Sequence, residues 1–464
     1  MNVLPGMIVV AACAGLLPGA GAAALGATAP IPPAAPGSQA RPSSPAAGAP
    51  EAALPDAGSF AQPTLPRADL LHQLLAQAPS LAEARALRDA AGARGDALRA
   101  GSQEFTAQAQ LQQRRVDEAP DNGRYAEWQL QLNRPLRLPA QARADRALAD
   151  ALAAQAREAQ RTARRELLDQ LLRAWFDTQL ADADAELARA SAQALDRQAG
   201  VVQRREQLGD ASRLEYDLVR AERARADAAA LQAQGRASSQ RAALLARWPL
   251  LAADPGLRGD PGSAVELLDA PADDAALRQR VLEHSATLAL ARSAVRQAQA
   301  QADQARAART PQPTVGAYLG SDRGGRERIV GLQLQIPIGG AARAAGERAA
   351  LADLDAAQWR LQELRMRVLE QAQSLSAQAR AQARAAQALM LAAASQQAAL
   401  ARTQRAWELG EAGVADWLLA RRNALDTRMQ AVQARFDAAR MNALLRLQEG
   451  LMDEASAEAP AARP

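Results

Sequence analysis

Cysteine, histidine and aromatic residues are all scarce in this 464-residue chain, which has one cysteine, two histidines and only 3% aromatic residues. A single cysteine excludes an internal disulfide framework and a metal site made of several cysteines. The histidines, His72 and His284, lie far apart and neither has a partner at metal-ligand spacing, so we expect no metal site. So few aromatic residues in an alanine-, arginine- and glutamine-rich chain favour long helices over thick globular cores.

Sequence motifs of catalysis are also missing. The chain has no P-loop, no nucleophile elbow, no HExxH sequence and no Rossmann glycine pattern. The 55 basic and 51 acidic residues leave a formal net charge of only +4 and are interspersed, which is typical of solvated helix faces rather than of a nucleic-acid-binding surface. We therefore predict a protein that is not an enzyme, needs no cofactor and binds no nucleic acid.

Long hydrophobic runs are absent apart from a short one near the start. Met7 to Leu17 is apolar and is followed by small residues, a pattern that predicts a signal peptide over residues 1–27. Cys13 follows Val-Ala-Ala, which resembles a bacterial lipobox, so Cys13 is either a lipidation site or a small residue of a discarded signal. Since no other segment approaches the roughly 20 apolar residues of a membrane helix, any membrane crossing must use strands.

Three segments have the composition of linkers. Residues 28–66 are rich in proline and alanine and cannot bury enough apolar surface to offset the cost of ordering, so we predict a disordered tether. The same character predicts a disordered tail over residues 455–464. Residues 249–273 are rich in proline, glycine and aspartate and are interpreted as a linker or small side element between two larger units.

What the chain does contain is an internal repeat. Residues 127–136 (EWQLQLNRPL) resemble residues 329–338 (IVGLQLQIPI), and residues 207–212 (QLGDAS) resemble residues 408–413 (ELGEAG) at nearly the same offset. Two similarities at one spacing indicate a duplicated unit. We place the first copy at 67–248 and the second at 274–454.

Each copy begins with a helix, which in the second copy we place from Asp274 to Arg309. A predicted β-hairpin follows, at residues 103–138 in the first copy and 313–338 in the second. In both hairpins apolar and polar residues alternate, so that one face of each strand is apolar. The apolar positions are Trp128, Leu130, Leu132, Val330, Leu332, Leu334, Ile336 and Ile338. Such strands fit either a membrane barrel or a half-buried sheet of a soluble protein; in lipid, four strands could not close a barrel, so several chains would have to share one.

Each copy continues with a predicted helix of about 70 residues, from Ala140 to Leu208 and from Ala341 to Leu409. At 1.5 Å per residue each is about 100 Å long, which no compact domain accommodates. Partial heptads and many alanines predict coiled-coil packing. Gly209 and Gly410 then supply the left-handed conformation with which each long helix ends and the chain reverses. The fold class is thus mainly α with a small β part.

The duplicated Leu-Gly-[Asp/Glu]-Ala turns and the Leu-Gln-x-x-x-Pro strands that run into Ala/Arg-rich helices resemble the TolC-like outer membrane efflux family, over roughly residues 67 to 452. The resemblance implies a homotrimer in the bacterial outer membrane, with a shared 12-stranded β-barrel and a periplasmic α-helical barrel. It implies a passive duct that a periplasmic adaptor protein links to an inner membrane pump. The long N-terminal extension and the sequence from Arg134 to Leu138 resemble the branch that serves heavy-metal cation pumps.

The same resemblance implies site residues. The two turns would form the tip that docks the adaptor, with Leu208, Gly209, Asp210, Ala211, Leu409, Gly410, Glu411 and Ala412. Asp416, and Glu215 in the equivalent place of the first copy, would be the acidic residues that constrict the aperture. The alternative is a soluble or periplasmic coiled-coil scaffold or adaptor without a pore. The sequence does not identify the exported substrate.

Overall fold

The computed structural model of the chain describes residues 62–450, apart from residues 118–119, 121 and 259–273. The predicted signal peptide, the lipidation candidate Cys13 and the predicted tail lie outside these residues. Most of the predicted tether does so as well.

Eight α-helices, four strands and three short 3-10 turns occur in the described residues. The helices are α1 (Ala68–Gln77), α2 (Pro79–Ala100), α3 (Pro139–Gln207), α4 (Arg213–Arg247), α5 (Asp274–His284), α6 (Ala286–Ala307), α7 (Ala341–Glu408) and α8 (Val414–Gln448). The strands are β1 (Thr106–Val116), β2 (Gly123–Pro135), β3 (Thr314–Asp322) and β4 (Glu327–Gln335). The 3-10 turns are η1 (Pro249–Ala253), η2 (Pro255–Arg258) and η3 (Arg323–Gly325).

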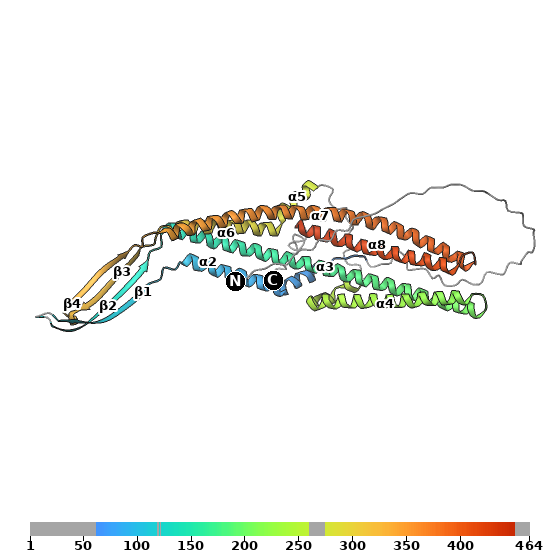
Figure 1. The fold of residues 1–464 in the computed structure, drawn as a ribbon, viewed down its shortest axis with the longest axis horizontal. Helices are drawn as coiled ribbons and strands as arrows, with labels where there is room; N and C mark the ends of the chain where they lie inside the picture. Colours follow the sequence, from blue (N-terminus) through green and yellow to red (C-terminus); the bar gives the residue numbers. More distant parts are fainter. Residues whose placement is uncertain (1–61, 118–119, 121, 259–273, 451–464) are drawn as a thin grey trace, which may run out of the picture. The chain divides into compact units, whose positions relative to one another are not determined.

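The duplication is visible in the order of elements. The series α2-β1-β2-α3-α4 is repeated as α6-β3-β4-α7-α8. Figure 1 shows two long helical hairpins, α3–α4 and α7–α8. The four strands lie beyond the ends of α3 and α7 that are farthest from the hairpin turns. The long helices begin and end within one residue of the predicted positions. This confirms the predicted fold class of a duplicated unit with two strands and long helices in each copy.

One helix was predicted where the structure has two. The expected helix from Asp274 to Arg309 breaks at Ser285, whose backbone is extended (φ −65°, ψ 112°). The Ser285 hydroxyl accepts a hydrogen bond from the backbone N–H of Leu288 (3.3 Å) and so caps α6. A serine inside an alanine-rich helical pattern can serve as an N-cap, and here it divides the segment into α5 and α6.

The four strands form one antiparallel sheet in the order β1-β2-β3-β4. The two hairpins join through β2 and β3, where Leu130 lies opposite Leu319 and Leu132 opposite Ala317. On the other face, Gln131 and Gln333 occupy equivalent positions of the two copies. The Gln131 side chain donates a hydrogen bond to that of Gln333 across the intervening strand.

The largest core lies midway along α3, around Trp175 and Phe176, and is completed by α8 through Phe436. Thr64 is also buried here, although the predicted tether extends to residue 66. The Trp175 indole donates to the Thr64 carbonyl (2.7 Å) and the Gln179 side chain donates to the Thr64 hydroxyl (2.6 Å). The end of the predicted tether is therefore anchored, because buried polar groups of α3 give its backbone hydrogen-bond partners.

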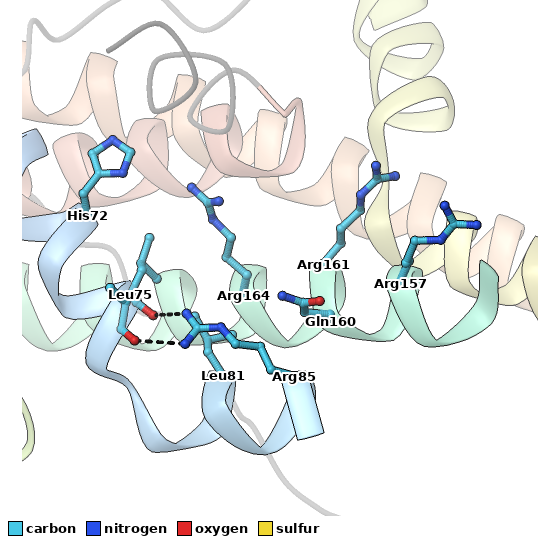
Figure 2. Close-up of a pocket in the computed structure, with 9 residues that line it drawn as sticks. His72, Leu75, Leu81, Arg85, Arg157, Gln160, Arg161 and Arg164 are labelled. Atoms are coloured by element: carbon cyan, nitrogen blue, oxygen red, sulfur yellow. Dashed lines mark hydrogen bonds between the residues drawn. The ribbon is translucent and has the colours of Figure 1, made fainter. Parts of the chain in front are cut away.

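The short helix α1 is held to α2 at its C-terminal end. The Arg85 guanidinium donates to the carbonyls of Ala76 (3.1 Å) and Leu75 (3.4 Å), as Figure 2 shows. These carbonyls have no partner within the helix, so a cation there also opposes the negative end of the helix dipole.

Helices α3 and α8 are the inner members of the two hairpins. Helix α3 packs against α4 and α8, and α8 also packs against α7. Most buried positions of the hairpins therefore belong to α3 and α8, whereas α4 and α7 keep broad exposed faces. Within one chain, α4 and α7 are the two edges of a four-helix layer.

Candidate functional site

The sheet exposes its apolar face. The apolar side chains of β2 and β4 that the alternation predicted are exposed, and Leu332 is 89% exposed. The cross-strand pairs place them on one face together with smaller residues of β1 and β3. That face comprises Ala107, Ala109, Leu111, Trp128, Leu130, Leu132, Val315, Ala317, Leu319, Val330, Leu332 and Leu334. An exposed apolar face of this kind, which no other described element covers, is typical of a surface that contacts lipid or another protein.

The opposite face is polar and internally hydrogen-bonded. Glu127 is 3% exposed and accepts a hydrogen bond from the Gln112 side chain (2.7 Å). Tyr318 lies over Gly331, where a Cβ would overlap its ring. Glycine on this face thus leaves room for a neighbouring side chain. The sheet therefore has one apolar face, suited to lipid, and one polar face, suited to water.

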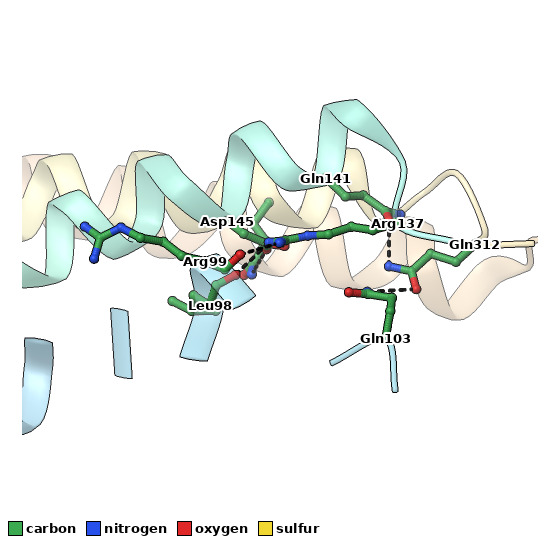
Figure 3. Close-up of polar contacts among 8 residues, drawn as sticks. Leu98, Arg99, Gln103, Arg137, Gln141, Asp145 and Gln312 are labelled. Atoms are coloured by element: carbon green, nitrogen blue, oxygen red, sulfur yellow. Dashed lines mark hydrogen bonds and ion pairs between the residues drawn. The ribbon is translucent and has the colours of Figure 1, made fainter. Parts of the chain in front are cut away.

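A polar cluster joins the strands to the helices (Figure 3). Arg137, between β2 and α3, donates to the carbonyls of Leu98 (2.6 Å) and Arg99 (2.7 Å) at the end of α2. Its guanidinium also pairs with Asp145 of α3 (2.6 Å), and both side chains are largely buried. Arg137 therefore fixes the angle at which α2 and α3 leave the sheet.

The second copy is tied into this junction by glutamines. The Gln141 side chain donates to the Thr310 carbonyl (2.9 Å), and Gln312 donates to the Gln141 side-chain oxygen (2.6 Å). Gln103, just before β1, donates to Gln312 (3.2 Å), as Figure 3 shows. No role was predicted for these glutamines, because neutral residues outside any motif carry no functional signal in the sequence.

At the far end of α3, the first hairpin turn is closed by backbone hydrogen bonds. Gly209 has a φ of +82°, its N–H donates to the Glu206 carbonyl (3.0 Å), and the Asp210 N–H donates to the Arg205 carbonyl (2.8 Å). This pair of bonds is the Schellman motif, which satisfies the last carbonyls of a helix. Leu208 is 72% exposed, so the turn presents an apolar side chain to its surroundings.

The second turn repeats this geometry. Gly410 has a φ of +77°, its N–H donates to the Trp407 carbonyl (3.0 Å), and the Glu411 N–H donates to the Ala406 carbonyl (2.8 Å). Leu409 is 60% exposed. The structure thus brings the predicted docking residues into two equivalent, exposed tips; their role in docking stays a prediction.

The two predicted aperture acids lie at the first turns of α4 and α8. Glu215 accepts a hydrogen bond from the Ser212 N–H (3.0 Å), and the Ser212 hydroxyl accepts one from the Glu215 N–H (3.2 Å), which together form a capping box. Asp416 accepts from the Gly413 N–H (3.3 Å). Both acids thus stabilise the first turn of their helix. Their role in an aperture stays a prediction.

Behind the turns, the four long helices share a small core. Trp407 of α7 stacks on Trp417 of α8, with ring centroids 4.9 Å apart and planes 16° from parallel. Val202 of α3 and Val219 of α4 belong to the same cluster. The two tips of one chain are therefore packed together rather than independent.

Two neighbouring arginines fasten α8 to both helices of the first hairpin. Arg421 is 3% exposed and donates to the carbonyl (2.7 Å) and hydroxyl (3.2 Å) of Ser191 on α3. Burial lowers the pKa of Arg421 to about 10, so the side chain remains charged at neutral pH. The neighbouring Arg422 donates to Glu222 of α4 (2.9 Å).

No helix among the described residues carries an apolar stretch long enough to cross a membrane. No group of three or more His, Cys, Asp or Glu side chains in the same residues is placed to hold a metal ion.

The sequence matches the model of a family described as outer membrane efflux protein, over residues 70–248 and 277–450. These two segments make up most of the chain. The chain belongs to the outer membrane efflux protein family. A search of curated protein sequences found no match.

Solved structures similar to this efflux protein share its fold. A membrane protein from Pseudomonas aeruginosa is 20% identical, with a TM-score of 0.68 over 82% of this chain and 89% of that one. The outer membrane protein VceC from Vibrio cholerae is also 20% identical, with a TM-score of 0.65 over 82% of this chain and 95% of VceC. The Campylobacter jejuni outer membrane channel CmeC is 13% identical, with a TM-score of 0.66 over 87% and 94%.

Family membership confirms three predictions from the sequence: the family itself, the location in the outer membrane and the absence of enzymatic activity. It also establishes the general function, which is efflux across the outer membrane.

Proposed function

We propose that three copies of this efflux protein form one duct, which exports solutes delivered by an inner membrane pump through a periplasmic adaptor. The observation that carries the proposal is the two-sided sheet at one end of helices about 100 Å long. Three such sheets would close a 12-stranded barrel with the exposed apolar face toward lipid and the glutamine-lined face toward the lumen.

The helix edges support assembly of like copies. Leu231 on α4 is 70% exposed and Leu391 on α7 is 73% exposed. Leu231 lies 18 residues after the start of α4 at Arg213, and Leu391 lies 18 residues before the turn at Leu409. Each leucine is therefore about 27 Å along its helix from the hairpin tip. The α7 edge of one copy can then lie against the α4 edge of the next, with the two leucines at the same distance from the tips.

Paired cysteines test this arrangement. The double variant Leu231→Cys, Leu391→Cys, oxidised in isolated membranes, should give covalent dimers and trimers and no larger ring. Each single variant is the matched control and should stay monomeric after denaturation. A double variant that forms no intermolecular bond, or a ladder that continues beyond three copies, contradicts the trimer.

Docking of the adaptor is assigned to the tips because Leu208 and Leu409 are exposed apolar side chains with open space beside Gly209 and Gly410. A photo-crosslinking residue at 208 or 409 in the native bacterium should capture a periplasmic partner. The same residue at Ala147, an exposed position near the other end of α3, is the control. Capture at 147 equal to that at the tips would argue against docking there.

The proposed aperture role of Asp416 is tested by removing the charge of its side chain while keeping the size. In the duct, a ring of three Asp416 carboxylates would favour cations and narrow the opening. Asp416→Asn removes the charge but keeps an oxygen that can accept from the Gly413 N–H, so the helix cap survives. We expect higher single-channel conductance and weaker cation selectivity in planar bilayers. Unchanged conductance and selectivity would show that Asp416 serves only as a cap.

A further inference from the structure

A pocket of about 410 Å³ lies between the short helices α1 and α2 and the long helix α3. Four of the nine described residues that line it are arginines and one is histidine, and none of the nine is acidic. These cationic or potentially cationic residues are His72, Arg85, Arg157, Arg161 and Arg164. Like charges gathered around one space raise the local positive potential and attract anions.

The arginines of α3 are placed as a row. Arg157, Arg161 and Arg164 follow one another at the i, i+4, i+7 spacing that puts side chains on one face of a helix. Figure 2 shows their side chains leaving the same side of α3, with His72 of α1 beyond Arg164. The row extends over about 10 Å, which is long enough for an anion with more than one charged group.

Arg161 and Arg157 each keep guanidinium N–H groups that their contacts within the chain do not use. Arg161 pairs through one nitrogen with Glu158 (2.9 Å), and Arg157 donates its Nε to the Ala153 carbonyl (3.3 Å). Because a guanidinium has five N–H donors, neither contact uses up the planar fork that binds oxyanions. The His72 Nε2 atom is shielded from solvent and has no hydrogen-bond partner among the described residues. A buried nitrogen without a partner is a position where a ligand atom would restore a hydrogen bond.

We propose that this pocket binds a small phosphate-bearing anion with two or more negative charges, held by Arg157, Arg161 and His72. Arg85 already fastens the end of α1 to α2, so a ligand bound here would bridge α1 and α2 to α3. The site would thereby stiffen the middle of the duct. This goes beyond the export function, and neither the sheet nor the tips take part in it.

The source of the phosphate is a soluble molecule rather than a lipid headgroup. Arg157 lies 18 residues after the start of α3 at Pro139, which is about 27 Å along the helix from the junction with the sheet. A headgroup at the edge of the apolar sheet could not reach it.

The test uses the full chain in neutral detergent with sodium pyrophosphate as the probe. Pyrophosphate should raise the thermal unfolding midpoint in a saturable way, compared with sodium chloride at the same ionic strength, and should slow hydrogen exchange in α1. The double variant Arg157→Gln, Arg161→Gln should lose at least about tenfold in pyrophosphate affinity, since each charge-assisted contact to an oxyanion is strong.

The matched control is Arg143→Gln, Arg146→Gln, two arginines of the same helix outside the pocket, and it should bind pyrophosphate like the unmodified protein. Equal effects of pyrophosphate and chloride would overturn the proposal. Equal pyrophosphate binding by both double variants would do so too, as would stabilisation by phosphatidylglycerol in mixed micelles without any effect of pyrophosphate.

Discussion

The two hairpin tips have the same backbone but different side-chain chemistry. Both turns close with a Schellman motif around a glycine of positive φ, and the caps that follow have almost the same backbone angles, −76° and 153° at Ser212 and −77° and 155° at Gly413. The first tip adds a complete capping box from Ser212 and Glu215. The second tip has one half of that box and instead contributes the Trp407–Trp417 stack.

The difference shows which parts of the turn the fold requires. A residue that can adopt a positive φ is required in both copies, because the helix must end within one residue and reverse. How the next helix is stabilised is free to vary between local hydrogen bonds and core packing. The second tip relies more on the shared core, so the two tips should respond differently to the same class of change.

The largest expected effect is at the second tip. Trp417→Ala removes a side chain that is 1% exposed and should lower the free energy of unfolding by about 3–5 kcal/mol. Tyr216, its equivalent in the first copy, is only partly buried, so Tyr216→Ala should cost clearly less. Unfolding of the solubilised protein in denaturant measures both. Equal losses would remove the distinction between the tips.

The glycines should behave alike. Gly209→Ala and Gly410→Ala would each force a side chain into the left-handed region at a cost of about 1–2 kcal/mol. An added Cβ meets no atom within 4 Å at either position, so steric overlap adds nothing. Matched losses in the unfolding midpoint are expected. A large loss at only one turn would mean that the turns are not equivalent.

The capping box belongs to the first tip alone. Ser212→Ala should cost about 1 kcal/mol, because the Glu215 N–H loses its acceptor at the exposed start of α4. Hydrogen exchange at the first turn of α4 should speed up, while the first turn of α8 stays unchanged. Faster exchange in both helices would show instead that the tips unfold as one unit.

The smallest effect should be a gain. Gly413→Ser introduces the hydroxyl that the second tip lacks, at backbone angles that already match those of Ser212. The nearest atom to the new Cβ would be the Asp416 carboxylate at 3.4 Å, an ordinary contact. We expect a rise of a few tenths of a kcal/mol, roughly the difference between serine and glycine at an N-cap. A fall in stability would mean that the added side chain disturbs the tip.

Much of this architecture could be predicted from local patterns. Alternation located the strands, and the alanine-rich partial heptads that end at Gly209 located the first long helix to within a residue. Ser212-x-x-Glu215 is itself a capping-box sequence, so the structural role of Glu215 could have been found as well. Its interpretation as an aperture residue came from the resemblance alone.

Other features depend on contacts between distant residues and left no sequence signal. The burial of Thr64 depends on Trp175 and Gln179, more than 100 residues away. In the sequence, Arg137 cannot be distinguished from the other arginines, because its role depends on contacts with the end of α2. The anion pocket likewise combines helices that are distant in sequence, and only the spacing of its α3 arginines is visible in one segment.

The central claim is that three chains form one duct in the outer membrane. The most direct measurement is fractionation of membranes from cells expressing the protein, followed by the mass of the detergent-solubilised particle. We predict an outer-membrane particle containing three copies of the chain. A monomer or dimer recovered from the soluble fraction would contradict the account and favour a coiled-coil scaffold without a pore.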